Sequence, residues 1–274
     1  MGLRRLHTFD VEYASAFGIL KALFALTRRK QKTEHPFPYV AQFACREGVW
    51  LAAAKALGTQ RVMGVDTKDA LESVTCLEPG EFNNIDLASV KVVLPLKADL
   101  LISVEYTHLL NTERAKMMVE DMCSSSDKIL FSAGIPYQVH NQDLNLRWPS
   151  YWAKQFYERG FLPDLKLREM IWSDPGIDPL FRQNCVLYTR AAKMPRKKPD
   201  FLKLDVVHPG IYEAIQAKQQ ALAMQLTRTT IRKLMKRKRR ESLMLSVGLV
   251  GSHTLDSTKG HSLGVQRDTH SATK

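Results

Sequence analysis

Segments typical of β-strands and of α-helices alternate along the chain from residue 38 to residue 190, with short connections between them. This alternation predicts an α/β sheet with helices on both faces. The predicted strands lie at 38–44, 61–66, 81–87, 98–104, 128–136, 166–172 and 184–190, and the helices between them at 47–57, 110–123 and 150–161. In such sheets ligands bind beyond the carboxyl ends of the strands, so the residues that follow the strands are the candidate site.

The segments on either side of this α/β region differ from it. Residues 10–30 have helical spacing of apolar groups, and residues 208–241 contain no Gly or Pro after position 210, which predicts one long helix. We therefore expect four parts, namely an N-terminal helical segment at 1–36, an α/β domain at 37–191, a basic linker and long helix at 192–241, and a disordered tail at 242–274.

The positive charge is concentrated near the C-terminus. The chain has a net charge of +12, and residues 191–274 hold 17 Lys and Arg against 6 Asp and Glu. The basic residues that we single out as a polyanion-binding cluster are Arg228, Arg232, Lys233, Lys236, Arg237, Lys238, Arg239 and Arg240. Three interpretations stay open for 228–240: a solvated helix end, contact with RNA, or contact with an anionic membrane surface.

The number and spacing of the cysteines bear on the redox compartment of the protein. Cys45, Cys76, Cys123 and Cys185 are far apart and form no CxxC pair, so we expect neither disulfides nor a structural metal. No apolar run reaches the ~18 residues that a bilayer span needs, and the first residues show no signal-peptide core. These features favour the cytoplasm or another reducing compartment, with a peripheral position at a membrane surface as an alternative.

Polar residues follow the first three predicted strands. The stretch FACREGVW (43–50) forms a tight turn that opens a helix, whose N–H groups can hold a polar or anionic ligand head. Asp66 is placed to accept hydrogen bonds from the hydroxyls of a ribose, or else to cap a turn. Asp86 could accept from an adenine amino group while Leu87 packs on the ring, or Asp86 could cap the next helix.

Further candidates follow the fourth and fifth strands. Glu105 and His108 are three residues apart and are the candidate catalytic residues. His108 is a candidate general base, with a purely structural role as the alternative. In the next connection, the candidates to line a substrate pocket are His140, Asn145, Trp148 and Tyr151, although aromatic side chains at helical spacing are more often part of a core.

Taken together and in this order, the segments QFACREGVWL (42–51), GVD (64–66), IDL (85–87), SVEYTHLL (103–110) and LRWPSYWAKQFYERGF (146–161) resemble class I S-adenosylmethionine-dependent methyltransferases. The resemblance covers residues 37–191 and implies a Rossmann-like seven-stranded sheet in the order 3-2-1-4-5-7-6, with the last strand antiparallel. It implies S-adenosyl-L-methionine as cofactor and methyl transfer to an oxygen or nitrogen of an unidentified acceptor. The cofactor-binding residues that it implies are Ala44, Cys45, Glu47, Gly48, Asp66, Asp86, Leu87 and Glu105.

The first motif departs from the family pattern at three positions. Gln42 stands where the family has an acid, and Ala44 and Arg46 stand where it has glycines, so that only Gly48 remains. Arg46 must either turn toward solvent or reach the cofactor's carboxylate. The alternative function is therefore a catalytically inactive scaffold that binds RNA or another polyanion through the basic C-terminal helix.

Overall fold

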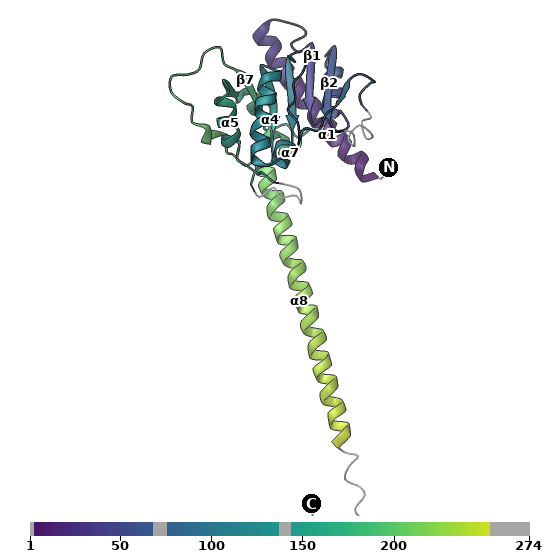
Figure 1. Cartoon of the computed structure of the whole chain (residues 1–274). Coiled ribbons are helices and arrows are strands. Elements are labelled where there is room, and N and C mark those ends of the chain that lie inside the picture. Colours follow the sequence, from purple (N-terminus) through teal and green to yellow (C-terminus); the bar gives the residue numbers. More distant parts are fainter. Residues whose placement is uncertain (1–2, 68–75, 137–143, 253–274) are drawn as a thin grey trace, which may run out of the picture. The chain divides into compact units, whose positions relative to one another are not determined.

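The computed structural model describes residues 3–67, 76–136 and 144–252 and contains one seven-stranded sheet (Figure 1). Its order is β3-β2-β1-β4-β5-β7-β6, and only β7 runs antiparallel to its neighbours. The strands are β1 Tyr39–Phe43, β2 Arg61–Asp66, β3 Phe82–Asn84, β4 Leu100–Val104, β5 Lys128–Ser132, β6 Phe161–Asp164 and β7 Val186–Arg190. The predicted fold class and strand order are confirmed.

Two layers of helices enclose the sheet because successive residues of a strand point to opposite faces. Ala41 and Phe43 of β1 belong to the core on one face, and Val40 belongs to the core on the other. The first face is covered by α4 Thr112–Ser125, α5 Pro149–Tyr157 and the 3₁₀ helix η2 Phe201–Leu204. The second face is covered by α1 Leu3–Gln31, α2 Val49–Ala56, α6 Lys166–Ile171 and α7 Pro179–Asn184. The central strands are thus buried on both sides.

The strand predicted at 166–172 is wrong, because that segment forms α6. Leu167 and Ile171 are four residues apart and both buried, which is the spacing of a helix face rather than of a strand. The sixth strand instead forms earlier, at Phe161–Asp164, directly after Gly160, whose φ of 83° makes the turn out of α5. The sequence prediction had assigned Phe161 to the end of the preceding helix.

The chain divides into two compact units, residues 1–212 and 213–274, so that α1 belongs to the same unit as the sheet. The long C-terminal helix α8 begins at Pro209, as expected, but continues to Ser252 instead of ending at 241. The apolar segment 243–250, expected to lie outside the helix, is therefore helical. Among the helices that the structure describes, none combines the length and the apolar character needed to cross a bilayer.

A buried ion pair fixes the connection between β3 and β4. Arg114 and Asp121 of α4 lie 2.9 Å apart, with side chains 7% and 1% exposed. The Arg114 guanidinium also donates to the carbonyl oxygens of Leu87 and Val90, and Asp121 accepts from the backbone N–H of Val92. Because charged groups in a core must be paired, this network holds the connection in one conformation.

Candidate functional site

The turn between β1 and α2 has an unusual backbone. Ala44, Arg46 and Gly48 have φ values of 58°, 46° and 77°, all in the left-handed region. For Gly48 the absence of a side chain is required, because a Cβ atom there would lie 2.7 Å from Cγ of Leu77. The turn thus keeps the backbone course of a glycine-rich loop with glycine at only one of these three positions.

Asp66 joins the end of β2 to this turn. Its Oδ2 accepts from the backbone N–H of Arg46 at 2.8 Å, and its Oδ1 accepts from the N–H of Thr67 at 2.8 Å. Asp66 is buried, and each carboxylate oxygen retains a second lone pair. The turn-capping role of Asp66 is therefore present in the structure, and accepting from a ribose hydroxyl remains compatible with it.

The Arg46 side chain points away from Asp66. Its guanidinium lies 3.9 Å from a carboxylate oxygen of Glu12 and 3.6 Å from one of Glu47, and the side chain is 66% exposed. Of the two alternatives for Arg46, the structure therefore has the one in which the side chain turns toward solvent.

The other residues of the turn have structural contacts. Cys45 is buried, and its Sγ lies where a Cβ atom on Gly64 would come within 2.6 Å. Burial and the negative charge of Asp66 raise the pKa of the Cys45 thiol, which keeps it protonated and unreactive. The carbonyl oxygen of Glu47 accepts from the N–H of Cys76 at 3.3 Å. These contacts favour packing over nucleophilic chemistry at Cys45.

The residues after β3 differ from the expectation of an adenine contact. Asp86 is exposed, and its two oxygens accept from the Ala88 N–H and the Ser89 hydroxyl. The Ser89 hydroxyl and then the Ala88 N–H hold the pKa of Asp86 below its ordinary value. Leu87 is fully buried in the core, and packing of its side chain on an adenine ring stays a prediction. The capping role of Asp86 is the one observed.

Glu105 follows β4 in a left-handed conformation, with φ of 52°. One carboxylate oxygen accepts from the hydroxyl of Ser132, the last residue of β5, and lies 3.4 Å from the amide nitrogen of Asn184 in α7. The sequence analysis singled out neither Ser132 nor Asn184. These two contacts fix the Glu105 carboxylate at the carboxyl edge of the sheet.

His108 is buried, and its ring accepts through Nδ1 from the backbone N–H of Gly134 at 2.9 Å. Its carbonyl oxygen accepts from the N–H groups of Leu144 and Asn145. A neutral imidazole that accepts at Nδ1 carries its proton on Nε2, so only Nδ1 could take a proton, and it would lose the contact with Gly134 in doing so. The geometry supports the structural role, and a base role for His108 stays a prediction.

The proposed substrate residues are only partly brought together. Asn145 is buried beside His108 and accepts from Arg147 Nε at 2.9 Å, and its amide nitrogen has no partner among the described residues. Trp148 and Tyr151 are half-buried at the start of α5, where Arg147 lies 5.3 Å from the centre of the Tyr151 ring. His140 lies outside the described residues.

Tyr106 is a site residue that the sequence analysis missed. It lies between Glu105 and the short 3₁₀ helix η1 Thr107–Leu109. Burial and the negative charges of Asp66 and Asp86 raise the pKa of Tyr106 to about 12. An aromatic residue after a strand carries no sequence signal of its own. The effect of these two charges shows that Tyr106 lies near the carboxyl ends of β2 and β3.

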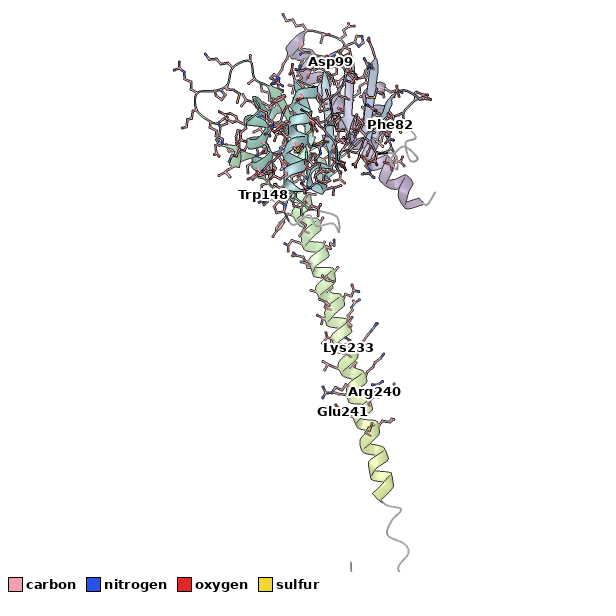
Figure 2. All side chains as sticks on the ribbon, viewed as in Figure 1. Phe82, Asp99, Trp148, Lys233, Arg240 and Glu241 are labelled. Carbon is pink, nitrogen blue, oxygen red and sulfur yellow. The ribbon has the colours of Figure 1, made fainter. Side chains whose placement is uncertain are left out.

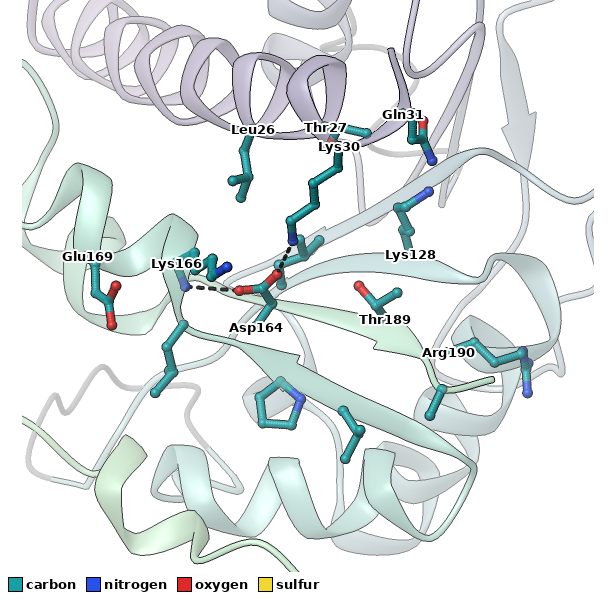
Figure 3. A pocket seen from close by; sticks show the side chains of 15 residues that line it. Leu26, Thr27, Lys30, Gln31, Lys128, Asp164, Lys166, Glu169, Thr189 and Arg190 are labelled. Carbon is teal, nitrogen blue, oxygen red and sulfur yellow. Dashed lines mark hydrogen bonds and ion pairs between the residues drawn. The ribbon is translucent and has the colours of Figure 1, made fainter. Parts of the chain in front are cut away.

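A separate cavity lies elsewhere in the described part of the chain. It has a volume of about 640 Å³ between the C-terminal part of α1 and strands β6 and β7 (Figure 3). There Asp164 pairs with Nζ of Lys30 at 2.8 Å and accepts from the N–H of Lys166. Its lining includes Lys128, the first residue of β5, whereas the candidate site follows the last residue of that strand. This cavity is therefore not the candidate site.

Within the described residues, no group of three or more His, Cys, Asp or Glu side chains is arranged to hold a metal ion.

No protein-family model matches the sequence, and no curated protein matches it. Among solved structures, the chain is similar to S-adenosylmethionine-bound CalS10, an amino pentose methyltransferase from Micromonospora echinaspora. The two sequences are 10% identical, the match covers 70% of this chain and 98% of CalS10, and the TM-score is 0.52. Magnesium protoporphyrin IX methyltransferase from Synechocystis is 16% identical over 66% and 86% of the two chains, with a TM-score of 0.46. An O-methyltransferase family protein from Burkholderia thailandensis is 14% identical over 69% and 57%, with a TM-score of 0.43.

Of these three likenesses, the one to CalS10 has a TM-score above 0.5, and at 10% identity it concerns the fold and leaves the reaction open. The strand order, with its antiparallel β7 between β5 and β6, agrees with the sheet that the sequence motifs imply. The chain has the fold of the class I S-adenosylmethionine-dependent methyltransferases.

Proposed function

We propose that this protein transfers a methyl group from S-adenosyl-L-methionine to an oxygen or nitrogen of an acceptor. The observation that carries the proposal is the pair of contacts at Arg46. Its backbone N–H is bound by Asp66, which ties the turn after β1 to the end of β2, while its guanidinium lies with Glu12 and Glu47. The side chain of the intruding arginine is thus paired with two carboxylates and largely exposed.

The residues at this edge suit a cationic nucleoside. The start of α2 offers N–H groups to the carboxylate of the methionine part, and Asp66 offers a carboxylate to the ribose hydroxyls. The Glu105 carboxylate, which accepts from Ser132 at this edge, would place negative charge near the sulfonium. When bound, the cofactor supplies an electrophilic methyl group. The acceptor atom would form its bond to the methyl carbon as the carbon–sulfur bond breaks and the demethylated cofactor leaves, and the proton of the acceptor would pass to water.

The chain's own contribution would be positioning rather than acid–base chemistry. The Glu105 carboxylate is fixed by Ser132, and the loop after β5 is fixed by the bond between Gly134 and His108. Holding two reactants in line lowers the barrier without a charged catalytic group. The half-buried Trp148 and Tyr151 would form part of the acceptor side, with Arg147 beside them.

A second candidate is a scaffold with this fold and no methyl transfer. It is favoured by Gln42, which replaces the family's acid on β1 and whose buried side-chain oxygen has no partner among the described residues. The left-handed Ala44 and Arg46 add backbone strain that glycines would not have.

Calorimetry with S-adenosylmethionine and its demethylated product separates the two candidates. We expect binding by the intact chain, and a loss of affinity of about tenfold or more in Asp66→Ala, which corresponds to ~1.4 kcal/mol. Asp99→Ala is the matched control, because Asp99 also accepts from a backbone N–H of β1, but at Tyr39, the opposite end of that strand. Absence of binding by the intact chain would refute the first candidate. Binding that appears only in Arg46→Gly would establish the second.

A further inference from the structure

The second half of α8 carries the strongest concentration of charge in the chain. Eight basic residues and no acidic residue lie between Arg228 and Arg240, and every side chain from Ala217 to Met244 is exposed. The only described ion pair in this stretch joins Arg237 to Glu241 at 2.8 Å, and both of these side chains are largely exposed. The charge of this segment is therefore almost entirely uncompensated within the described part of the helix.

The basic residues share one side of the helix. At about 100° per residue, seven of the eight fall within an arc of about 180°, with Lys238 as the exception. Lys233, Lys236, Arg237 and Arg240 border a hollow of about 330 Å³ together with Glu241, and Lys233, Arg240 and Glu241 can be located in Figure 2. We call the eight basic residues the basic arc.

The spacing of the basic arc works against the isolated helix. Arg228 and Arg232, Arg232 and Lys236, and Lys236 and Arg240 are each four residues apart, so they are neighbours on the helix surface. Lys233 and Arg237 form a fourth such pair. Like charges at this spacing destabilise a helix, and a bound polyanion would remove the repulsion and stabilise the conformation seen here.

The apolar side chains of α8 argue against a membrane as the partner. A helix that lies in a membrane surface needs its apolar residues on one continuous face. Within the basic segment, Ile231, Leu234 and Met235 are exposed and lie opposite the basic arc. This apolar face does not continue along the helix, because the exposed Leu222 and Leu226 lie on the same side as the basic arc. The residues from Glu213 to Met244 include no Trp, Tyr or Phe to anchor the helix in the headgroup region.

We propose that the basic arc of α8 binds the phosphate backbone of a nucleic acid, without reading its sequence. Side chains spread over about half the circumference can reach phosphates on both sides of the helix, as a chain of phosphates requires. The segment lacks the aromatic side chains on which bases would stack, so phosphate contacts dominate. This inference does not depend on methyl transfer by the other unit.

The test measures binding of the full chain to a fluorescent single-stranded RNA of about 25 nucleotides by fluorescence anisotropy. A DNA duplex of about the same length serves as a second probe. If about six phosphates are contacted, raising the salt from about 50 to about 200 mM should weaken RNA binding on the order of 10²-fold. The triple variant Arg232→Gln/Lys236→Gln/Arg240→Gln should lose affinity about tenfold or more, and its log–log salt slope should fall by about two.

The matched control is Lys193→Gln/Arg196→Gln/Lys197→Gln, which removes the same charge from exposed positions of the linker. It should retain affinity within about twofold, and circular dichroism should show that both variants keep their helix content. Equal losses in the two triple variants would overturn the proposal, as would the absence of RNA and DNA binding. Tighter binding to vesicles with about 30% phosphatidylserine than to either nucleic acid, at the same salt, would show that the partner is a membrane instead.

Discussion

The backbone N–H of Arg46 lies 2.8 Å from Oδ2 of Asp66, and this hydrogen bond connects the turn after β1 to the last residue of β2. It is formed by a residue with φ of 46°, at a position where the resembling family has glycine. The turn therefore keeps its conformation without glycine and at a cost in backbone strain.

Replacing Arg46 by glycine should stabilise the protein. The left-handed conformation costs a residue with a Cβ atom about 1–2 kcal/mol, and glycine loses ~0.5–1 kcal/mol more in chain entropy on folding. We expect Arg46→Gly to raise the free energy of unfolding by about 0.5–1 kcal/mol in urea titrations. Gly48→Ala should lower it, because Gly48 has φ of 77° and its Cβ would lie 2.7 Å from Leu77. A destabilised Arg46→Gly would contradict this account.

The buried pair between Arg114 and Asp121 should be intolerant of single substitutions. Asp121→Asn or Arg114→Met leaves one charge buried without its partner, which costs about 3–5 kcal/mol. The double variant Arg114→Met/Asp121→Leu should recover part of that loss, because neither charge then remains in the core. The exposed pair Arg237 and Glu241 is the control, and Glu241→Gln should change stability by less than about 0.5 kcal/mol. Thermal unfolding of the four variants checks this.

Substitutions of His108 distinguish a structural role of its imidazole from a catalytic one. His108→Phe removes the acceptor for the Gly134 N–H and should destabilise by about 1–3 kcal/mol. His108→Asn places an amide oxygen near the position of Nδ1 and should recover at least half of that loss. If methyl transfer is detected, the asparagine variant should retain activity with an unchanged pH profile. A large fall in rate at full stability would show instead that the imidazole moves a proton.

The raised pKa of Glu12 predicts that the stability of the fold depends on pH. Burial raises the pKa of its carboxyl above the ordinary value, although the Arg46 guanidinium acts in the opposite direction. A folded-state pKa above the unfolded one means that the folded protein binds more protons between the two values, so this carboxyl lowers stability as pH rises through that window. Glu12→Gln should therefore raise the melting temperature at pH values above the window and leave it nearly unchanged below. An equal shift at all pH values would exclude the carboxyl charge as the cause.

Local sequence predicted much of this molecule because its signals are short in range. The apolar run at 100–104 and the acid that ends 61–66 lie where a buried parallel strand and its carboxyl end were expected. The segment 166–172 was misassigned because a short stretch of mixed apolar and charged residues fits either structure, and the buried pair Leu167 and Ile171 decides for the helix only once the core is known. The role of Asp86 was ambiguous for the same reason, because its local sequence fits both a helix cap and a contact with adenine.

The sequence by itself determined the class of fold, the edge of the sheet where a ligand would bind and the segregation of positive charge in α8, because periodicity, strand-end residues and charge are local properties. Only the tertiary structure decided that the Arg46 guanidinium points to Glu12, that Leu87 is buried in the core, and that Asn184 lies beside Glu105, 79 residues away in sequence. Such contacts depend on how strands and helices pack, and packing brings together residues whose separation along the chain carries no signal.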